Sequence, residues 1–137
     1  MSSESFDLHP VLKADCHRLG RLGSARLLLH RNARLHWFIL VPQTPLLDLL
    51  DLPAAETAEL MREAKAVSSL LKQRFAYPRV NVGALGLLVP QLHLHVIGRR
   101  EGDGCWPQPV WGNLAESLDY EEHELDYLRN WVESART

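Results

Sequence analysis

Two histidines that alternate with apolar residues are the strongest candidates for chemistry in this chain. They lie in the segment 90–97, PQLHLHVI, which is followed by a glycine and two arginines. Alternation of apolar and polar residues is typical of a half-buried β-strand, whose successive side chains point to opposite faces. We therefore expect Gln91, His93 and His95 to share one face, with neighbours roughly 6.6–6.8 Å apart along the strand. A carboxamide and two imidazoles at this spacing can surround one phosphorus atom or one metal ion.

Three interpretations of His93 and His95 are open at this level. Both can be surface residues on the solvated face of an antiparallel sheet. Both can be metal ligands, although a zinc site needs at least a third protein ligand, and neither the scattered other histidines nor the carboxylates have an evident ligand spacing to the pair. In the third, a neutral imidazole attacks an α-phosphorus to give a nucleotidyl-histidine, while a neighbouring group protonates or holds the leaving atom. The third interpretation fits the residue types best.

The composition is that of an ordinary globular domain, expected here to be a single domain over residues 1–137. Hydrophobic residues make up 46% of the chain and charged residues 23%. The net charge of −2 gives no general attraction to nucleic acid or to an acidic membrane surface. Two cysteines far apart in sequence indicate neither a disulfide framework nor a zinc motif. We expect a cytoplasmic protein, because no signal peptide is visible and no apolar run reaches the roughly 18 residues that span a bilayer.

Four short segments are predicted to form the strands that carry the histidines. The apolar runs 25–31 and 36–41 predict a hairpin. The alternating segments 79–85 and 90–97 predict a second pair of strands, joined by a turn at Gly86. Two such pairs, separated by a helix, favour an α+β fold in which an antiparallel sheet has helices packed on one side.

Apolar residues at spacings of three and four predict three helices. These are expected over residues 10–20, 54–75 and 121–134. The charged residues of 54–75 are expected to face water, since charged pairs on a helix add only tenths of a kcal/mol. The proline-rich and glycine-rich segments 43–53 and 99–112 are expected to be loops, and the apolar residues of the first predict that it is packed.

The segment 91–97, QLHLHVI, resembles the motif of the histidine triad (HIT) family, which is His-φ-His-φ-His-φ-φ with φ apolar. Gln91 stands in place of the first histidine of that motif. The resemblance extends over roughly residues 25–104 and continues to a C-terminal segment, 106–112, that resembles a bacterial subgroup. The other positions that carry the resemblance are Asn32, the strand 37–42 ending in proline, Asn81, the turn at Gly86 and the segment 99–103.

This resemblance implies a nucleotide-binding α+β domain, a homodimer whose sheets join edge to edge, and hydrolysis or transfer at the α-phosphate of a nucleotide. By position, His93 corresponds to the nucleophile and His95 to the histidine on the leaving-group side. Gln91 corresponds to the histidine that helps to organise the nucleophile. The implied ligands are purine nucleotides or dinucleotides, such as nucleoside phosphoramidates or diadenosine polyphosphates, with no cofactor and no metal. The nucleotide-binding positions that it implies are Asn32, Asn81, Gly86 and Arg99.

Several positions depart from the family pattern. Glutamine can donate and accept hydrogen bonds but cannot titrate. Leu87 and Leu88 stand where family members often have polar residues that contact phosphate. Aligning the strand on its proline puts Trp37 where the family has a histidine, and His36 is one residue off, which places it on the other face. These departures support a second hypothesis, a nucleotide-binding module with weak or lost catalysis.

The residues implied by the resemblance also have purely structural interpretations. Asn32 can be a turn former, and Arg99 can be a solvated surface residue. An asparagine in a strand, as at Asn81, is less easily explained in this way because strands are depleted in Asn. Trp106 and Trp111 can close over a base or pack at a dimer interface, or they can simply be buried within their own loop.

Overall fold

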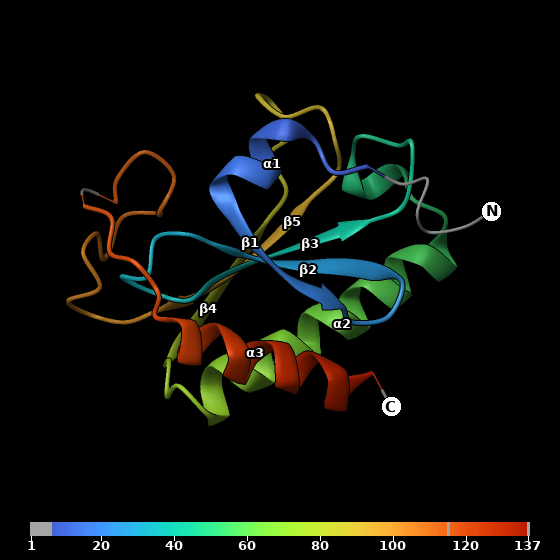
Figure 1. The fold of residues 1–137 in the computed structure, drawn as a ribbon. Helices are drawn as coiled ribbons and strands as arrows, with labels where there is room; N and C mark the ends of the chain where they lie inside the picture. The colour runs from blue at the N-terminus through green and yellow to red at the C-terminus, as the bar shows by residue number, and fades with distance from the viewer. Residues whose placement is uncertain (1–6, 115, 137) are drawn as a thin grey trace.

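The protein folds around one antiparallel sheet of five strands in the order β1-β2-β3-β5-β4, as the computed structural model shows for residues 7–114 and 116–136 (Figure 1). This confirms the predicted α+β class with an antiparallel sheet. The strands are β1 (Cys16–Arg21), β2 (Ala25–His30), β3 (Trp37–Pro42), β4 (Arg79–Gly83) and β5 (Leu94–Arg99).

The two long helices, α2 (Ala54–Gln73) and α3 (Glu122–Ala135), pack on the same face of the sheet, whereas the short helix α1 (Pro10–Asp15) lies on the other side (Figure 1). Helix α2 packs on β3, β4 and β5, and α3 packs on β1. Both helices lie where the apolar spacing predicts them. Because α1 has only six residues, the second face of the sheet is left partly open, and the site lies there.

The predicted hairpin of β2 and β3 forms the centre of the sheet. Leu28 pairs with Ile39, and Ile39 pairs in turn with His95 on β5, so these three side chains share a face. Phe38 pairs with Val96, and both are fully buried under the helices. Burial on both faces explains why β3 has a continuous apolar sequence rather than an alternating one.

The predicted helix over 10–20 is wrong beyond Asp15. Residues Cys16–Arg21 form the edge strand β1, which pairs with β2. The register between the two strands shifts between Arg18 and Gly20, as in a β-bulge. The extra residue leaves Cys16 and Leu19 both buried at a spacing of three, which mimics the spacing of a helix.

Two further predictions are corrected on the way to β4. The loop 43–53 contains a short 3₁₀ turn (Leu49–Asp51) and is packed only in part: Leu52 and Leu49 pack on the core, whereas Leu47 and Leu50 are exposed. Glu63 on α2 does not face water but is buried, and its carboxylate accepts hydrogen bonds from the main chain of Ser24 and Ala25. The helix therefore fixes the turn between β1 and β2.

Candidate functional site

His93 and His95 line one cavity of about 350 Å³ on the face of the sheet that carries α1. Their rings are in edge-to-face contact, with centroids 4.9 Å apart. Strand β5 begins only at Leu94, so His93 belongs to an irregular segment that leads into the strand rather than to the strand predicted over 90–97. The alternation is nevertheless kept, since Leu92 is buried in the core while both imidazoles face the cavity.

The hydrogen bond of His93 fixes which ring nitrogen is free. His93 Nδ1 lies 2.6 Å from the main-chain carbonyl oxygen of Gln91. A carbonyl oxygen can only accept, so Nδ1 carries the proton and donates it to this bond. Nε2 of a neutral His93 therefore keeps its lone pair, which is the state that a nucleophile requires.

His95 has the opposite tautomer. The indole Nε1–H of Trp37 donates to His95 Nδ1 at 2.9 Å. An indole nitrogen can only donate, so Nδ1 accepts and Nε2 of His95 carries the proton. The ring of His30 stacks on Trp37 with centroids 4.2 Å apart and planes 10° apart, which holds the indole in place. The site thus pairs one unprotonated Nε2 with one Nε2–H.

Burial keeps this part of the cavity uncharged. Burial, with smaller contributions from the nearby imidazoles of His93 and His30, lowers the pKa of His95 from 6.5 to about 3. Burial also lowers the pKa of His30, against the opposing effect of Asp15. His95 is therefore a neutral hydrogen-bond donor at neutral pH rather than a charged acid.

Trp111 packs against His95 from the loop that follows β5. Its ring contacts His95 in an edge-to-face arrangement with centroids 5.2 Å apart, and it also contacts Trp37. A Cβ added at Gly83, which pairs with His95, would lie 3.1 Å from the Trp111 ring. The indole therefore covers the end of the sheet beside His95.

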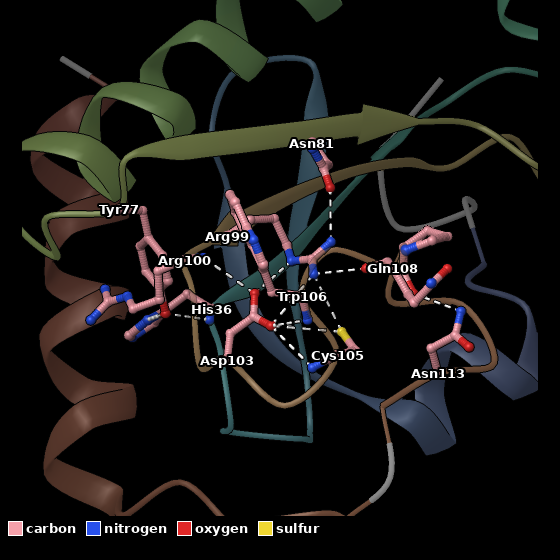
Figure 2. A network of polar contacts seen from close by, with 11 residues as sticks. His36, Tyr77, Asn81, Arg99, Arg100, Asp103, Cys105, Trp106, Gln108 and Asn113 are labelled. Carbon is pink, nitrogen blue, oxygen red and sulfur yellow. Dashed lines mark hydrogen bonds and ion pairs between the residues drawn. The ribbon is translucent and has the colours of Figure 1, made fainter.

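Arg99 holds this loop in place by an extensive set of hydrogen bonds (Figure 2). Its guanidinium pairs with Asp103 at 2.7 Å and donates to the Gln108 carbonyl at 2.8 Å and to Asn81 Oδ1 at 3.0 Å. Burial opposes the charge on Asp103, but the bond from Arg99 and the N–H groups of Cys105, Arg100 and Trp106 lower its pKa to about 2. The pair thus fixes the main chain that carries Trp111.

Of the four positions predicted to bind nucleotide, Gly86 lines the cavity, at a φ of 65° that suits glycine. The other three bond within the protein. Asn32 donates to the Glu116 carbonyl and accepts from the N–H groups of Arg34 and Leu118, which makes it a buried anchor of the C-terminal segment. Asn81 and Arg99 belong to the loop network described above.

The side chain of Gln91 turns away from His93, unlike the predicted shared face. Its Oε1 accepts from the His9 N–H at 2.7 Å, and its Nε2 donates to the Asp7 carbonyl at 2.9 Å. Gln91 thus ties the segment before α1 to the segment that carries His93. Its contact with His93 is made by its main-chain carbonyl.

Trp37 and His30 were not among the site residues expected from the sequence. Trp37 lies two residues before Ile39, and Ile39 pairs with His95, so the place of Trp37 beside His95 depends on the pairing of β3 with β5. His36 faces the other side of the sheet, where it bonds to the Tyr77 hydroxyl and stacks on Phe75. The one-residue offset between Trp37 and His36 therefore does place them on opposite faces.

Within residues 7–114 and 116–136, no three His, Cys, Asp or Glu side chains gather in a metal-binding arrangement. In the same part of the chain, no helix has the length and apolar character needed to cross a membrane.

Comparison with known proteins places this chain in a family. The HIT domain family model matches residues 12–102. The chain is similar to a histidine triad protein of known structure from Sinorhizobium meliloti 1021, with 35% identity over 98% of this chain and 99% of that one and a TM-score of 0.87. It is also similar to a histidine triad protein from Bradyrhizobium japonicum, with 36% identity over 96% of this chain and 98% of that one and a TM-score of 0.86. A third, from Marinobacter aquaeolei VT8, is 36% identical over 95% of both chains, with a TM-score of 0.85. No curated protein matches. The chain therefore belongs to the HIT domain family, whose fold is that of nucleotide-binding hydrolases and transferases in general.

Proposed function

We propose that this protein is a hydrolase or nucleotidyl transferase acting at the α-phosphate of a purine nucleotide, through a nucleotidyl-histidine on His93. The substrate is a nucleoside phosphoramidate or a dinucleoside polyphosphate. The observation that carries the proposal is the pair of fixed tautomers, His93 with a free Nε2 and His95 with an Nε2–H, in one cavity. These are the two states that nucleophilic attack and support of a leaving group require.

In the first step, the Nε2 lone pair of His93 forms a bond to the α-phosphorus, and the bond from phosphorus to the leaving nitrogen or oxygen breaks. The leaving atom keeps the electron pair and takes a proton from water, while the His95 Nε2–H donates a hydrogen bond to it. The Gln91 carbonyl stabilises the positive charge that develops on His93, because it accepts from Nδ1. In the second step, water or another acceptor attacks the phosphorus and releases His93. We propose that the main chain at Gly86 contacts the phosphate, and that Asn32, Asn81 and Arg99 support the nucleotide site from behind.

A second candidate is a nucleotide-binding module with weak or lost catalysis. It is favoured by the low pKa of His95, which leaves the site without a charged acid, and by the engagement of the Gln91 side chain elsewhere. It predicts nucleotide binding without turnover.

We also propose that the protein is a homodimer joined at β4. This strand lies at the edge of the sheet, and Val82 on it is 53% exposed. An edge strand has unpaired N–H and C=O groups that a second copy can pair with. The molar mass in solution, measured by light scattering, tests this proposal.

The function is tested by turnover of adenosine 5′-phosphoramidate and diadenosine tetraphosphate, with and without a chelator. The wild-type protein is compared with His93→Ala and with the control His123→Ala, whose side chain is exposed and outside the cavity. We expect turnover that the chelator does not abolish, lost in His93→Ala and kept in His123→Ala. Binding without turnover selects the binding module, and equal activity in all three proteins rejects His93 as nucleophile.

A further inference from the structure

A second cavity, of about 380 Å³, lies on the opposite face of the sheet from His93 and His95. It is formed where the C-terminal end of α2 lies beside the N-terminal end of α3 (Figure 1). We call it the helix-side cavity. None of its lining residues belongs to the proposed nucleotide site, so the proposed function leaves it unexplained.

Three aromatic rings form the walls of the helix-side cavity, and Leu128 adds an apolar surface. The imidazole of His36 stacks on Phe75, with centroids 4.0 Å apart and planes 19° apart. Phe75 in turn makes an edge-to-face contact with Tyr127, with centroids 6.3 Å apart. Aromatic walls with a few polar groups are typical of sites for small molecules, and they favour a flat aromatic ligand.

Arg74 supplies a cation at this cavity that no carboxylate neutralises. Its guanidinium carbon lies 5.8 Å from the centroid of the Tyr127 ring. In the part of the chain that the structure describes, none of the ion pairs includes Arg74. A guanidinium beside an aromatic ring can still pair with a carboxylate through two parallel hydrogen bonds.

Glu124 limits how much negative charge the cavity accepts. Its carboxylate lines the cavity and accepts a hydrogen bond from the Glu121 N–H at 2.9 Å. A ligand with several negative charges, such as a nucleotide phosphate, would be repelled by it. A single carboxylate on the ligand therefore matches the cavity best.

His36 supplies a neutral hydrogen-bond donor. The Tyr77 hydroxyl accepts from the His36 main-chain N–H at 2.9 Å and lies 2.8 Å from His36 Nδ1 (Figure 2). Among the described residues this hydroxyl has no other acceptor, so its O–H donates to Nδ1 and Nε2 carries the proton. Burial lowers the pKa of His36 to about 4, so the ring is neutral at pH 7. Nε2–H has no partner within residues 7–114 and 116–136 and is not sealed in the core, which leaves it open to a ligand.

We propose that the helix-side cavity binds a small, flat aromatic carboxylate. The carboxylate of the ligand pairs with Arg74, and its ring packs against Phe75 and Tyr127. A ring nitrogen or hydroxyl oxygen of the ligand accepts from the Nε2–H of His36. This second site does not depend on the chemistry of His93 or on the ligand bound beside it.

Binding is tested by NMR titration of the amide signals of Arg74, Phe75 and residues 123–128 in the full chain. The probes are nicotinate, which has both a carboxylate and a ring acceptor, benzoate, which lacks the ring acceptor, nicotinamide, which lacks the charge, and AMP. The variant Arg74→Met removes the cation and keeps a long side chain. Lys72→Met is the matched control, because Lys72 is also an exposed cation near the end of α2 but lies outside the cavity. Both altered side chains are exposed, so the variants keep the fold.

We expect nicotinate to shift these amide signals with a dissociation constant of about 1 mM or below. Benzoate should bind about threefold more weakly, the scale of one neutral hydrogen bond, and nicotinamide about tenfold more weakly. Arg74→Met should weaken nicotinate binding about tenfold, whereas Lys72→Met should leave it unchanged.

Three results would overturn the site. The first is the absence of shifts at these amides with nicotinate up to about 10 mM, including the case in which only the signals of His93 and His95 move. The second is nicotinate binding that Arg74→Met leaves as strong as in the wild-type protein, or that Lys72→Met weakens equally. The third is binding of nicotinamide or AMP in the helix-side cavity at least as tight as that of nicotinate, since a single negative charge is then not what the cavity recognises.

Discussion

Replacing Trp37 with phenylalanine removes one hydrogen-bond donor and keeps an aromatic ring at the same place. In the wild-type protein, the indole Nε1–H of Trp37 donates to His95 Nδ1 at 2.9 Å, and the indole stacks on His30. The phenyl ring can still stack, but it leaves a buried acceptor on His95 without a partner. An unsatisfied buried acceptor costs about 1–3 kcal/mol, so we expect the free energy of unfolding to fall by about that amount.

The same substitution releases the tautomer of His95. A neutral hydrogen bond contributes about 0.5–1.5 kcal/mol net, and a tenfold change in rate corresponds to about 1.36 kcal/mol. If the wild-type bond serves to hold Nε2–H toward the leaving group, kcat falls roughly 2- to 12-fold in Trp37→Phe. The nitrogen-15 chemical shifts of the His95 ring report the tautomer directly. We expect a protonated Nε2 and an accepting Nδ1 in the wild-type protein, and averaged shifts in the variant.

Trp111→Phe is the matched control for this experiment. Trp111 also packs on His95, but its buried Nε1 has no hydrogen-bond partner among the described residues. The Trp111→Phe substitution should therefore leave the His95 tautomer unchanged. The reasoning is refuted if Trp37→Phe leaves the ring-nitrogen shifts as they are in the wild-type protein, or if Trp111→Phe changes them to the same extent.

Three further predictions follow from buried groups. Arg99→Met leaves the Asp103 carboxylate buried without its cation, so we expect the free energy of unfolding measured in urea to fall by about 3–5 kcal/mol. Adding Asp103→Asn to this variant should recover part of the loss. An unchanged urea midpoint in Arg99→Met would contradict the prediction. Gly98→Ala places a Cβ 2.5 Å from the Tyr77 ring, so we expect a loss of about 1–3 kcal/mol from overpacking, and a neutral result would show that the ring moves easily. His95 has a folded pKa of about 3 against 6.5 unfolded, so between about pH 6.5 and pH 3 the unfolded chain binds more protons and stability falls as the pH falls. In urea titrations over this range, the free energy of unfolding of His95→Gln should depend less steeply on pH, by up to about 1.4 kcal/mol per pH unit. An unchanged dependence would mean that His95 does not titrate as its burial indicates.

The local pattern of apolar and turn residues was sufficient to predict much of the fold. The hairpin over 25–31 and 36–41 is predicted because each strand is a short apolar run bounded by turn residues, and the structure confirms it as β2 and β3. The edge strand β1 was missed because its bulge makes buried residues recur at a spacing of three. Pattern methods assume a fixed period, and a bulge breaks the period without any change in composition.

The site depended more on contacts between distant segments. His93 and His95 were found because both lie in one alternating segment. The role of Trp37 required the pairing of β3 with β5, which no local signal supplies. The capture of the Gln91 side chain by Asp7 and His9, 84 and 82 residues away in sequence, could not be foreseen.

The hydrogen bonds of Arg99 are a further example of contacts that the sequence pattern does not predict. A charged residue that follows a strand is expected at the surface, yet Arg99 is buried because Asp103, four residues later, turns back to pair with it. The motif resemblance indicated a nucleotide contact at this position. Its guanidinium instead bonds to the loop that carries Trp111, so we assign it a supporting role in the proposed site.

The central claim, that His93 is a nucleophile, is tested most directly by the mass of the intact protein after a rapid quench without acid. The wild-type protein and His93→Ala are mixed with adenosine 5′-phosphoramidate in the presence of a chelator. We predict an adduct of the mass of one adenylate on the wild-type protein, located on His93 by fragmentation, and no adduct on His93→Ala. An adduct on another residue, or product formed by His93→Ala at the wild-type rate, would contradict the mechanism.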